Sequence, residues 1–314
     1  MDRCIWNLCN SNCIMCTNPF GFRDSKKAEF YSKENVLGII KSDAIKSGPT
    51  ESVNLTGGEP TIHPDFLEIL TETRNMLPDA EICFVTNGRR LVYPDFTRKV
   101  LEFNNLQIRS VIHSHKAEVH DSITRTPGSF KQTIKGVRNL FRMRNNSHVI
   151  NLRVVILKQN YRDLDEISKF IHNKFGKFFR PQDKLAFMFP EYEGRAEKNF
   201  EQVKVSYTQV NNHIEDVLKK WPKYFYEKFF VFHFPLCTID STLWKYVTRS
   251  IPTDNDEYTF LEKCNDCIYK KYCVSIHKDY IKNFGQDEFT PFREEVDNDL
   301  VIDEDDFFRP IKKS

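Results

Sequence analysis

Short apolar runs alternate with longer amphipathic segments along the first two thirds of the chain, and this alternation restricts the fold more than any other feature. In the longer segments the apolar residues recur every three or four positions, which places them on one face of a helix. Strands that are each followed by a helix pair in parallel. We therefore predict a parallel α/β fold with helices within residues 63–78, 128–143 and 163–175, and strands at Cys4–Leu8, Val53–Thr56, Ile82–Thr86, Ile108–His113, Leu152–Leu157 and Leu185–Phe189.

An unusual loop follows each of the six predicted strands. In a parallel barrel the loops at the carboxyl ends of the strands converge on one rim, where active sites form. Turn formation explains any one of these loops, but six together favour a single composite site. The loops are the cysteine-rich segment at 9–16, GGEP at 57–60, Asn-Gly at 87–88, His-Ser-His at 113–115, Lys-Gln-Asn at 158–160 and EYEGRA at 191–196.

The bulk composition argues against several function classes. The 314 residues include 46 basic and 44 acidic side chains, and a net charge of +2 argues against a nucleic-acid or membrane surface. No apolar run approaches the roughly 20 residues that span a bilayer, and the N-terminus lacks the pattern of a signal peptide. Nine cysteines without a secretion signal indicate a cytoplasmic protein that uses them for metal binding or catalysis.

Three cysteines lie within eight residues, at Cys9, Cys13 and Cys16, and we call them the cysteine trio. Three soft thiolates select zinc, copper(I) or an iron–sulfur cluster. Structural zinc takes four ligands and would need Cys4 or a distant histidine as the fourth. A cubane iron–sulfur cluster has a direct use for three protein ligands, because its fourth iron then stays open for a substrate.

The trio spacing Cys-x3-Cys-x2-Cys, followed by LTGGEPTIHPDF at 55–66 and FVTNG at 84–88, resembles the radical SAM enzymes. The resemblance implies a partial (β/α)6 TIM-like barrel in which the trio holds a [4Fe–4S] cluster with S-adenosylmethionine (SAM) at its open iron. The reduced cluster cleaves SAM to methionine and a 5′-deoxyadenosyl radical, which abstracts a hydrogen atom from the substrate, so no catalytic side chain is assigned beyond these cofactors. The residues that the resemblance places at the methionine end of SAM are Gly57, Gly58, Glu59 and Pro60.

Two further residues are candidate contacts to the cofactor. Ser114 follows the fourth predicted strand, where many radical SAM enzymes contact the ribose. Arg153 lies on the fifth, and its guanidinium suits the planar carboxylate of methionine. Support of the rim or of the fold is an equal alternative for both. We expect turn and packing roles for His113, His115 and His120, and small, buried apolar roles for Cys4 and Cys83.

A second cysteine group consists of Cys237, Cys264, Cys267 and Cys273, and four thiols suit either a structural zinc or a fully ligated [4Fe–4S] cluster. CNDCIYKKYC at 264–273 resembles the second half of SPASM and twitch extensions, which carry auxiliary iron–sulfur clusters. No cysteine follows Cys273, so we expect one auxiliary cluster, with an electron-relay or structural role. The chain then divides into a barrel at 1–200, an auxiliary-cluster region at 201–290 and an acidic, solvated tail at 291–314.

Several segments between residues 9 and 273 also resemble the His-Xaa-Ser system radical SAM maturases. Among them are CNSNCIMC, HDSITRTPGSFKQTIKGVRNL, NLRVVILKQN and FPLCTIDSTLWKYVTRSI. This resemblance implies a ribosomally made peptide as the substrate and a second radical SAM maturase as a partner, and the chemistry needs an external electron donor.

Two other interpretations stay open on the sequence alone. The first is a radical SAM enzyme that acts on RNA or on a small metabolite. The second is a non-catalytic binding protein that zinc stabilises at the C-terminal cysteines. Iron content and SAM cleavage after anaerobic reconstitution separate the second from the enzymes.

Overall fold

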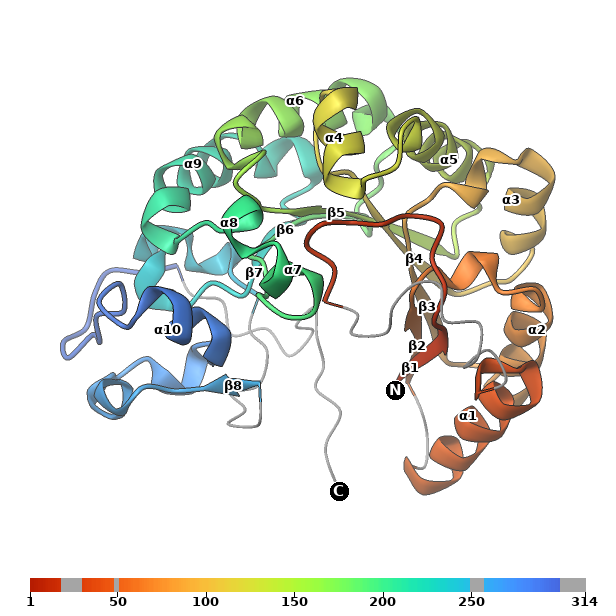
Figure 1. Cartoon of the computed structure of the whole chain (residues 1–314), viewed down its shortest axis with the longest axis horizontal. Helices are drawn as coiled ribbons and strands as arrows, with labels where there is room; N and C mark the ends of the chain where they lie inside the picture. Colours follow the sequence, from red (N-terminus) through yellow and green to blue (C-terminus); the bar gives the residue numbers. More distant parts are fainter. Residues whose placement is uncertain (18–29, 48–50, 249–256, 300–314) are drawn as a thin grey trace.

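A computed structural model describes residues 1–17, 30–47, 51–248 and 257–299, which form a curved sheet with helices along its outer side (Figure 1). The strands are β1 (Asp2–Trp6), β2 (Ser52–Gly57), β3 (Glu81–Thr86), β4 (Leu106–Val111), β5 (His148–Val155), β6 (Lys184–Met188), β7 (Phe229–Phe232), β8 (Tyr258–Thr259) and β9 (Ile276–His277). The α-helices are α1 (Lys33–Ser47), α2 (Phe66–Met76), α3 (Pro94–Val100), α4 (Ala117–Thr124), α5 (Ser129–Met143), α6 (Leu164–Phe175), α7 (Arg195–Lys198), α8 (Phe200–Val203), α9 (Tyr207–Lys220) and α10 (Lys278–Phe284).

The main sheet contains strands β1 to β7 in chain order, and every neighbouring pair is parallel. The predicted α/β fold with a partial barrel is therefore confirmed, and β1 and β7 stand at the two ends of the sheet. The seventh strand was not predicted. It lies within an aromatic segment at 223–237 whose continuous apolar run, FFVF, lacks the alternation that marks a strand, and it is defined by its pairing with β6.

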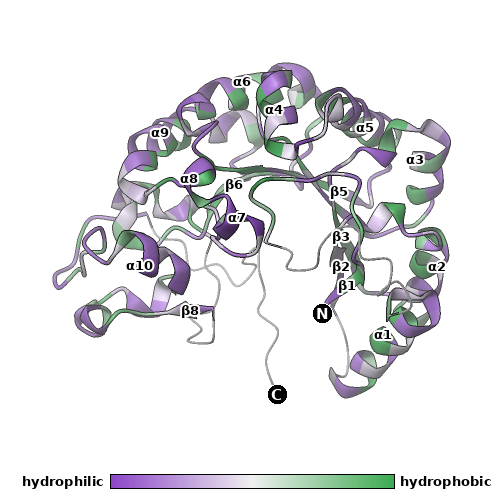
Figure 2. Ribbon diagram, in the orientation of Figure 1, coloured by the Kyte–Doolittle hydropathy of each residue, from purple (hydrophilic) through white to green (hydrophobic). Residues whose placement is uncertain are grey.

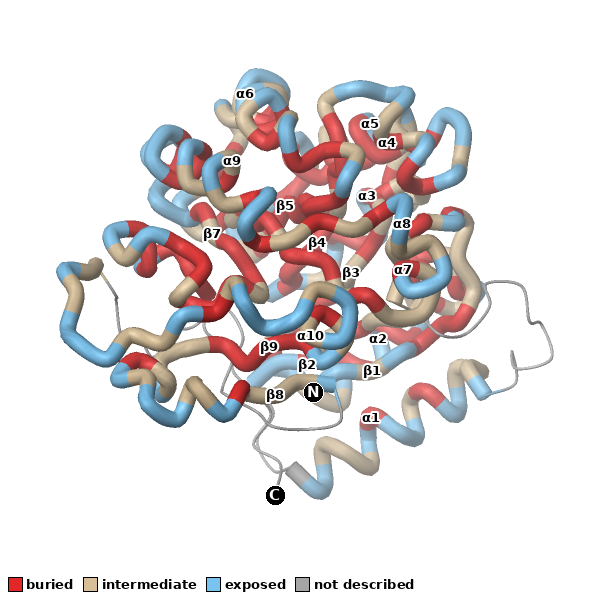
Figure 3. Tube along the Cα trace, turned by 60° about the vertical axis from the view of Figure 1, so that its left-hand side comes forward, coloured by how far each residue is buried: buried red, intermediate tan, exposed pale blue. Residues whose placement is uncertain are grey.

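The two faces of the sheet have different surroundings. Phe84 of β3 contacts Phe66 of α2, with the ring centroids 5.4 Å apart, so residues in line with Phe84 face the helices. Their in-register neighbours on this face, such as Leu55 and Ile108, are completely buried. Residues at the alternate positions point to the concave side. The hydrophobic core thus lies between sheet and helices. Figure 3 shows that the central strands of the sheet are largely buried.

Local sequence explains where the helices begin. Ser206 and Gln209 form a capping box, in which each side chain bonds the other's backbone N–H, and α9 follows directly. Helix α5 starts after Gly128, whose φ of +80° favours glycine, and buries its apolar stripe. Helix α2 begins at Phe66, within the predicted segment 63–78 and two residues after Pro64. Figure 2 shows the same amphipathic character, since the outer helices carry both hydrophobic and hydrophilic residues.

Beyond β7 the chain forms a smaller region beside that edge of the sheet (Figure 1), with the antiparallel pair β8–β9 and helix α10. Its aromatic centre includes Trp244, whose ring lies 4.8 Å from that of Tyr269 and 5.3 Å from that of Phe292. Most of the predicted acidic tail, at 300–314, lies outside the described residues, as does the end of the segment FPLCTIDSTLWKYVTRSI. Within the described part of the chain the longest helices have 15 residues, and none has the length and apolar character to cross a membrane.

Two cysteines in the strands have different environments. Cys83 of β3 is buried, as predicted. The prediction for Cys4 is wrong, because this residue is exposed. Cys4 lies on β1, a strand at one edge of the sheet, and its in-register partner Thr56 places it on the concave side.

Candidate active site

The GGEP turn lies directly against the start of the cysteine loop. The Gly58 N–H donates to Trp6 O at 2.7 Å, and the Glu59 N–H donates to Leu8 O at 2.8 Å. A Cβ on Gly57 would lie 2.1 Å from Trp6 O, and one on Gly58 would lie 2.2 Å from Leu8 O. Glycine is therefore required at both positions, because the end of β2 packs against the backbone that leads into the cysteine trio.

Glu59 is buried, and both of its carboxylate oxygens accept hydrogen bonds from the protein. Oε1 accepts from the Thr61 N–H at 3.1 Å, from Thr61 Oγ1 at 2.5 Å and from Thr86 Oγ1 at 2.7 Å, while Oε2 accepts from the Asn87 N–H at 2.6 Å. Burial raises the pKa of this carboxyl group, and the hydrogen bonds oppose that shift. Glu59 thus ties the GGEP turn to the Asn-Gly turn after β3.

Asn87 extends this network to the cysteine loop. Its Nδ2 donates to Asn10 Oδ1 at 2.6 Å and approaches Ser11 Oγ at 3.4 Å and Cys9 Sγ at 3.8 Å. Its Oδ1 accepts from the Arg89 N–H at 3.0 Å, and the Arg89 guanidinium in turn donates to Asn10 O. The sequence marked Asn-Gly as a loop after a strand, but it gave no sign that this amide holds the cysteine loop.

The other end of the cysteine loop is held by α4 and by the loop after β6. The Asn12 and Ile14 N–H groups donate to the carbonyls of Thr124 and Ile123, both at 2.9 Å. The Arg195 N–H donates to Cys16 O at 2.9 Å. Gly194 lies so close that an added Cβ would be 2.7 Å from Thr17 O. The loops after β2, β3 and β6 therefore converge on the loop after β1, as we predicted for the loops at the carboxyl ends of the strands.

The three thiols of the trio are half-buried and lie close enough to influence one another. Burial, and then the neighbouring charge of Glu59, raise the pKa of Cys9 to about 12. Burial and the other two thiols raise the pKa of Cys13. A bound metal displaces such protons, because a coordinating thiol ionises. The Ser11 N–H already donates to Cys9 Sγ at 3.3 Å, which is a contact that also stabilises a sulfur ligand of an iron–sulfur cluster.

Ser114 lies in the loop after β4 but is completely buried. Its Oγ accepts the Lys116 N–H at 3.0 Å and so shapes the turn. The neighbouring histidines pack as expected, since the His113 N–H donates to His120 Nδ1 at 3.2 Å and the two rings lie 5.5 Å apart. Burial lowers the pKa of His113 to about 3 and that of His120 to about 4, so both rings are neutral.

Arg153 lies on the concave side of β5, and β3 and β4 separate it from the GGEP strand. Its guanidinium carbon lies 5.7 Å from the ring centroid of Phe232 on β7. Burial and the nearby Arg109 lower the pKa of Arg153 to about 9. Arg153 therefore lies on the concave face with Arg109 of β4 on one side and Phe232 of β7 on the other.

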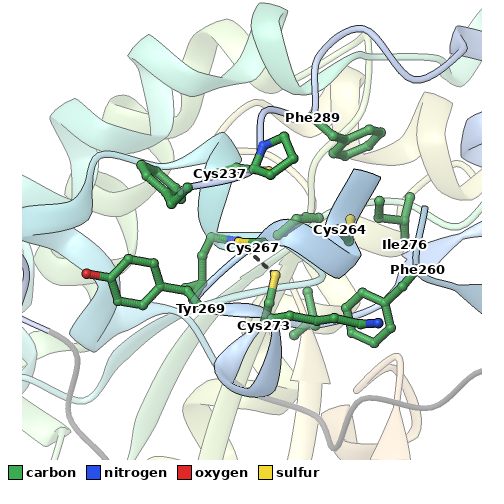
Figure 4. Close-up of a pocket in the computed structure, with 14 residues that line it drawn as sticks. Cys237, Phe260, Cys264, Cys267, Tyr269, Cys273, Ile276 and Phe289 are labelled. Atoms are coloured by element: carbon green, nitrogen blue, oxygen red, sulfur yellow. Dashed lines mark hydrogen bonds between the residues drawn. The ribbon is translucent and has the colours of Figure 1, made fainter. Parts of the chain in front are cut away.

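The four C-terminal cysteines converge on one pocket of about 420 Å³, including space open to solvent (Figure 4). Apolar side chains complete its walls, among them Phe260, Tyr269, Ile276 and Phe289. The Leu236 N–H donates to Cys273 Sγ at 3.3 Å. Burial raises the pKa of Cys237 to about 11. A soft-metal centre is the chemistry that this set of donors can support.

Side chains from β8, from β9 and from the residue that follows β7 contact the loop after β6. The Tyr258 hydroxyl donates to Glu191 Oε1, which also lies 3.4 Å from His233 Nδ1, and His277 Nε2 lies 2.9 Å from Glu193 Oε1. Glu193, His277 and Asp279 place one ligand atom each within 4.8 Å of the others. The Asp279 N–H donates to His277 Nδ1 at 3.3 Å, which leaves the ring proton on Nε2 for Glu193. Both ring nitrogens are thus engaged, and we assign no metal here.

The comparisons with known proteins agree with this geometry. The family model for the radical SAM superfamily matches residues 4–171, which include the cysteine loop and the sheet from β1 to β5. The chain belongs to the radical SAM superfamily. Radical SAM enzymes use a [4Fe–4S] cluster and SAM, and the trio and the GGEP turn lie within the matched residues.

Among curated radical SAM relatives, the mycofactocin maturase MftC of Mycobacterium tuberculosis is 26% identical over 178 residues, which is 56% of this chain and 42% of that protein. The GTP 3′,8-cyclase of Mannheimia succiniciproducens is 26% identical over 175 residues, or 54% of this chain and 49% of that protein. This chain therefore spans about half the length of these relatives.

One solved structure, Streptococcus suis SuiB bound to the precursor peptide SuiA, has 15% sequence identity to this chain and a TM-score of 0.52. The alignment covers 73% of this chain and 48% of that one. At this identity the likeness concerns the fold alone.

Proposed function

We propose that this chain is a radical SAM enzyme that modifies a ribosomally made peptide by abstracting a hydrogen atom from it. The observation that carries the proposal is the cysteine loop, which hydrogen bonds from the GGEP turn, Asn87 and Arg195 fix at the rim of the barrel. When bound there, the cluster and SAM supply hydrogen abstraction from an unactivated C–H bond. An external one-electron donor must reduce the cluster.

The residues at the rim fit this assignment. Cys9, Cys13 and Cys16 offer three soft thiolate ligands and leave one iron of a cubane for SAM. Glu59 makes its hydrogen bonds to the protein, so we assign its side chain to holding the turn. Gly57, Gly58 and Pro60 shape the same turn. Ser114 and Arg153 then support the rim and the concave face respectively, which was the alternative role for each.

We assign an auxiliary [4Fe–4S] cluster to the region at 201–290. The four thiols of Cys237, Cys264, Cys267 and Cys273 line one pocket and would be its ligands. The resemblance of residues 264–273 to SPASM and twitch extensions supports an iron–sulfur cluster over one zinc ion.

Two comparisons support a peptide as the substrate. The curated relative MftC is named as a maturase, and the SuiB structure contains a precursor peptide. A second candidate is a small metabolite, which the matches to GTP 3′,8-cyclases favour. The maturase resemblance adds a second radical SAM maturase as the partner class, and co-purification tests it.

Anaerobic reconstitution with iron and sulfide, followed by reductant and SAM, tests the proposal. Two cubanes correspond to about eight irons per chain, and the reduced protein should release 5′-deoxyadenosine. Cys13→Ala should lose about four irons and all cleavage of SAM. Cys83→Ala is the control, because it removes a thiol from the same barrel, at the buried Cys83 of β3, yet should keep both properties. Zinc without iron in the wild-type chain, or SAM cleavage by Cys13→Ala, would contradict the assignment. Mass spectrometry of candidate peptides then separates peptide from metabolite.

A further inference from the structure

Helix α5 carries a row of basic side chains on its outer face. They recur at intervals of three and four residues, which places them on one side of the helix, and they are Lys131, Lys135, Arg138 and Arg142. Arg138 is half-buried and the other three are exposed, whereas Val137 and Leu140 on the opposite side pack in the core. This row, which we call the basic stripe, runs about 17 Å along the outer side of the barrel (Figure 1).

Within the described part of the chain, no side chain of the basic stripe makes a hydrogen bond, an ion pair or a contact with an aromatic ring. Helix α5 contains no acidic residue, unlike every other described α-helix of eight or more residues. The neighbouring helices α3, α4 and α6 carry five acidic residues, and four of them already bind elsewhere: Asp95 to Arg98, Asp121 to the start of α5, Asp165 to Lys220 and Glu166 to Lys169. The fifth, Glu118, lies in the first turn of α4. The four charges of the stripe therefore face at most one free carboxylate from these helices.

This arrangement of charges works against the stability of the helix. Lys131 lies in the first turn of α5, where the helix macrodipole favours a negative charge. Lys131 and Lys135 are like charges four residues apart and repel each other, as do Arg138 and Arg142. Helices α6 and α9 intersperse acidic and basic residues, as a solvated helix surface usually does. A sequence that breaks these local rules without a compensating contact points to a function of the surface.

The N-terminal end of α5 lies against the residues that hold the cysteine trio. Thr133 Oγ1 donates to Asn87 O at 2.8 Å, and Asn87 Nδ2 approaches Cys9 Sγ at 3.8 Å. Gln132 Oε1 accepts from Arg89 Nε at 2.7 Å, and the Arg89 guanidinium also donates to the cysteine loop. The first two turns of α5, which carry one half of the basic stripe, are therefore two contacts away from a thiol of the trio.

We propose that the basic stripe is the docking surface for an acidic one-electron carrier protein, which reduces the cluster at the trio. The choice of this partner rests on the proposed function, because that chemistry needs an external electron donor. One electron passes from the carrier to the cluster, so the carrier is oxidised by one electron, the cluster is reduced by one, and no bond is made or broken. Electron-transfer partners meet through small interfaces, and complementary charge sets their rate of association, which suits an exposed row of cations. Nucleic acid is the less favoured partner, because the stripe includes no aromatic side chain on which a base could stack.

Binding of the carrier is measured first, without reductant or SAM. Oxidised flavodoxin and an acidic [2Fe–2S] ferredoxin are each titrated in a calorimeter into the reconstituted full-length chain. At least one should bind the wild type, and an increase in salt from about 0.1 M to about 1 M should weaken binding, because the screening length shortens from about 10 Å to about 3 Å. Lys131→Glu/Lys135→Glu should weaken binding at least about tenfold. Glutamate is a good helix former, so this variant should fold.

Lys41→Glu/Lys46→Glu is the matched control for the charge reversal. It exchanges two exposed lysines of α1 that also lack partners within the described part of the chain. The total charge of the protein changes by the same amount in both variants. The control should therefore bind the carrier like the wild type.

The second measurement is the initial rate of 5′-deoxyadenosine release, with the reduced carrier and separately with dithionite, a small reductant that needs no docking surface. Lys131→Glu/Lys135→Glu should be about tenfold slower with the carrier and unchanged with dithionite. Equal binding of the carrier by this variant and the wild type, failure of both carriers to bind the wild type, or an equal loss of rate with dithionite overturns the docking surface. A nucleic-acid duplex that binds through the stripe when neither carrier does also overturns it. A wild-type chain that cleaves no SAM with dithionite contradicts the proposed function, and the titration still decides the docking surface.

Discussion

The hydrogen bonds of Asn87 to the cysteine loop can be removed by one substitution, which tests whether this loop must be ordered to hold iron. Asn87→Ala removes the 2.6 Å bond to Asn10 and the 3.0 Å bond from the Arg89 N–H, but it leaves the backbone bond to Glu59 intact. At about 1 kcal/mol for each net hydrogen bond, the loss is about 2 kcal/mol. If the whole of this free energy is lost from the ordered state of the cysteine loop, the ratio of ordered to open loop falls about thirtyfold.

The expected result is a loss of function out of proportion to the loss of stability. Asn87→Ala should unfold in urea with a free energy about 2 kcal/mol lower, and should retain fewer irons after anaerobic desalting, because the open loop binds the cluster poorly. Release of 5′-deoxyadenosine should fall in parallel.

Asn139→Ala is the matched control for Asn87→Ala. The Asn139 Nδ2 donates to Leu91 O at 2.9 Å and to Val92 O at 3.2 Å, so this variant also loses two bonds of a half-buried amide. Those bonds hold the segment before α3 and not the cysteine loop. Asn139→Ala should therefore lose similar stability and keep its iron. If both variants lose iron equally, or if Asn87→Ala keeps a full complement and full SAM cleavage, our account of the loop is refuted.

Three further predictions concern the turn, the fold and the pH. Gly58→Ala should lose iron at the trio, because the added Cβ would lie 2.2 Å from Leu8 O. As its control, Gly38→Ala adds a Cβ to α1 with no atom within 4 Å, and it should raise the free energy of unfolding in urea by up to about 1 kcal/mol. Asp183→Asn should lower the free energy of unfolding by about 3–5 kcal/mol, because it leaves the fully buried Arg144 without its anion, while SAM cleavage per folded chain stays constant. Burial holds the pKa of His113 at about 3, against about 6.5 in an unfolded chain, so the unfolded state binds more protons below pH 6.5. The free energy of unfolding should therefore decline as the pH falls from 6.5 towards 3, as measured by urea denaturation at a series of pH values. If the free energy of unfolding of His113→Gln declines as steeply over the same range, this prediction is contradicted.

The contacts at the loop after β6 suggest how the two cysteine regions are held relative to each other. Arg195 of this loop donates to Cys16 O, and Glu193 of the same loop bonds His277. His277 follows Ile276, which lines the pocket of the second cysteine group. The segment from 193 to 195 thus contacts the cysteine trio at one end and the C-terminal region at the other, so the loop couples the positions of the two sites.

The sequence alone determined the class of fold, and it predicted soft-metal chemistry for both cysteine groups without deciding between zinc and an iron–sulfur cluster at the second. Alternating apolar runs and amphipathic segments predict parallel strands with helices, because both periodicities are local properties of the chain. The spacing of the cysteine trio and the sequence of the GGEP turn are likewise local properties of the chain, so the sequence by itself predicts a site at one rim of the barrel.

The tertiary structure decided what depends on register and on distant contacts. Arg109, Asn151 and Lys184 are separated by more than 30 residues along the chain, and only the pairing of β4, β5 and β6 places them in one row. The seventh strand and the exposure of Cys4 depend on which strand lies at an edge of the sheet. A local pattern says which face of a strand is apolar, but it does not say which residue of another strand stands beside it, because strand pairing is fixed by packing over the whole sheet.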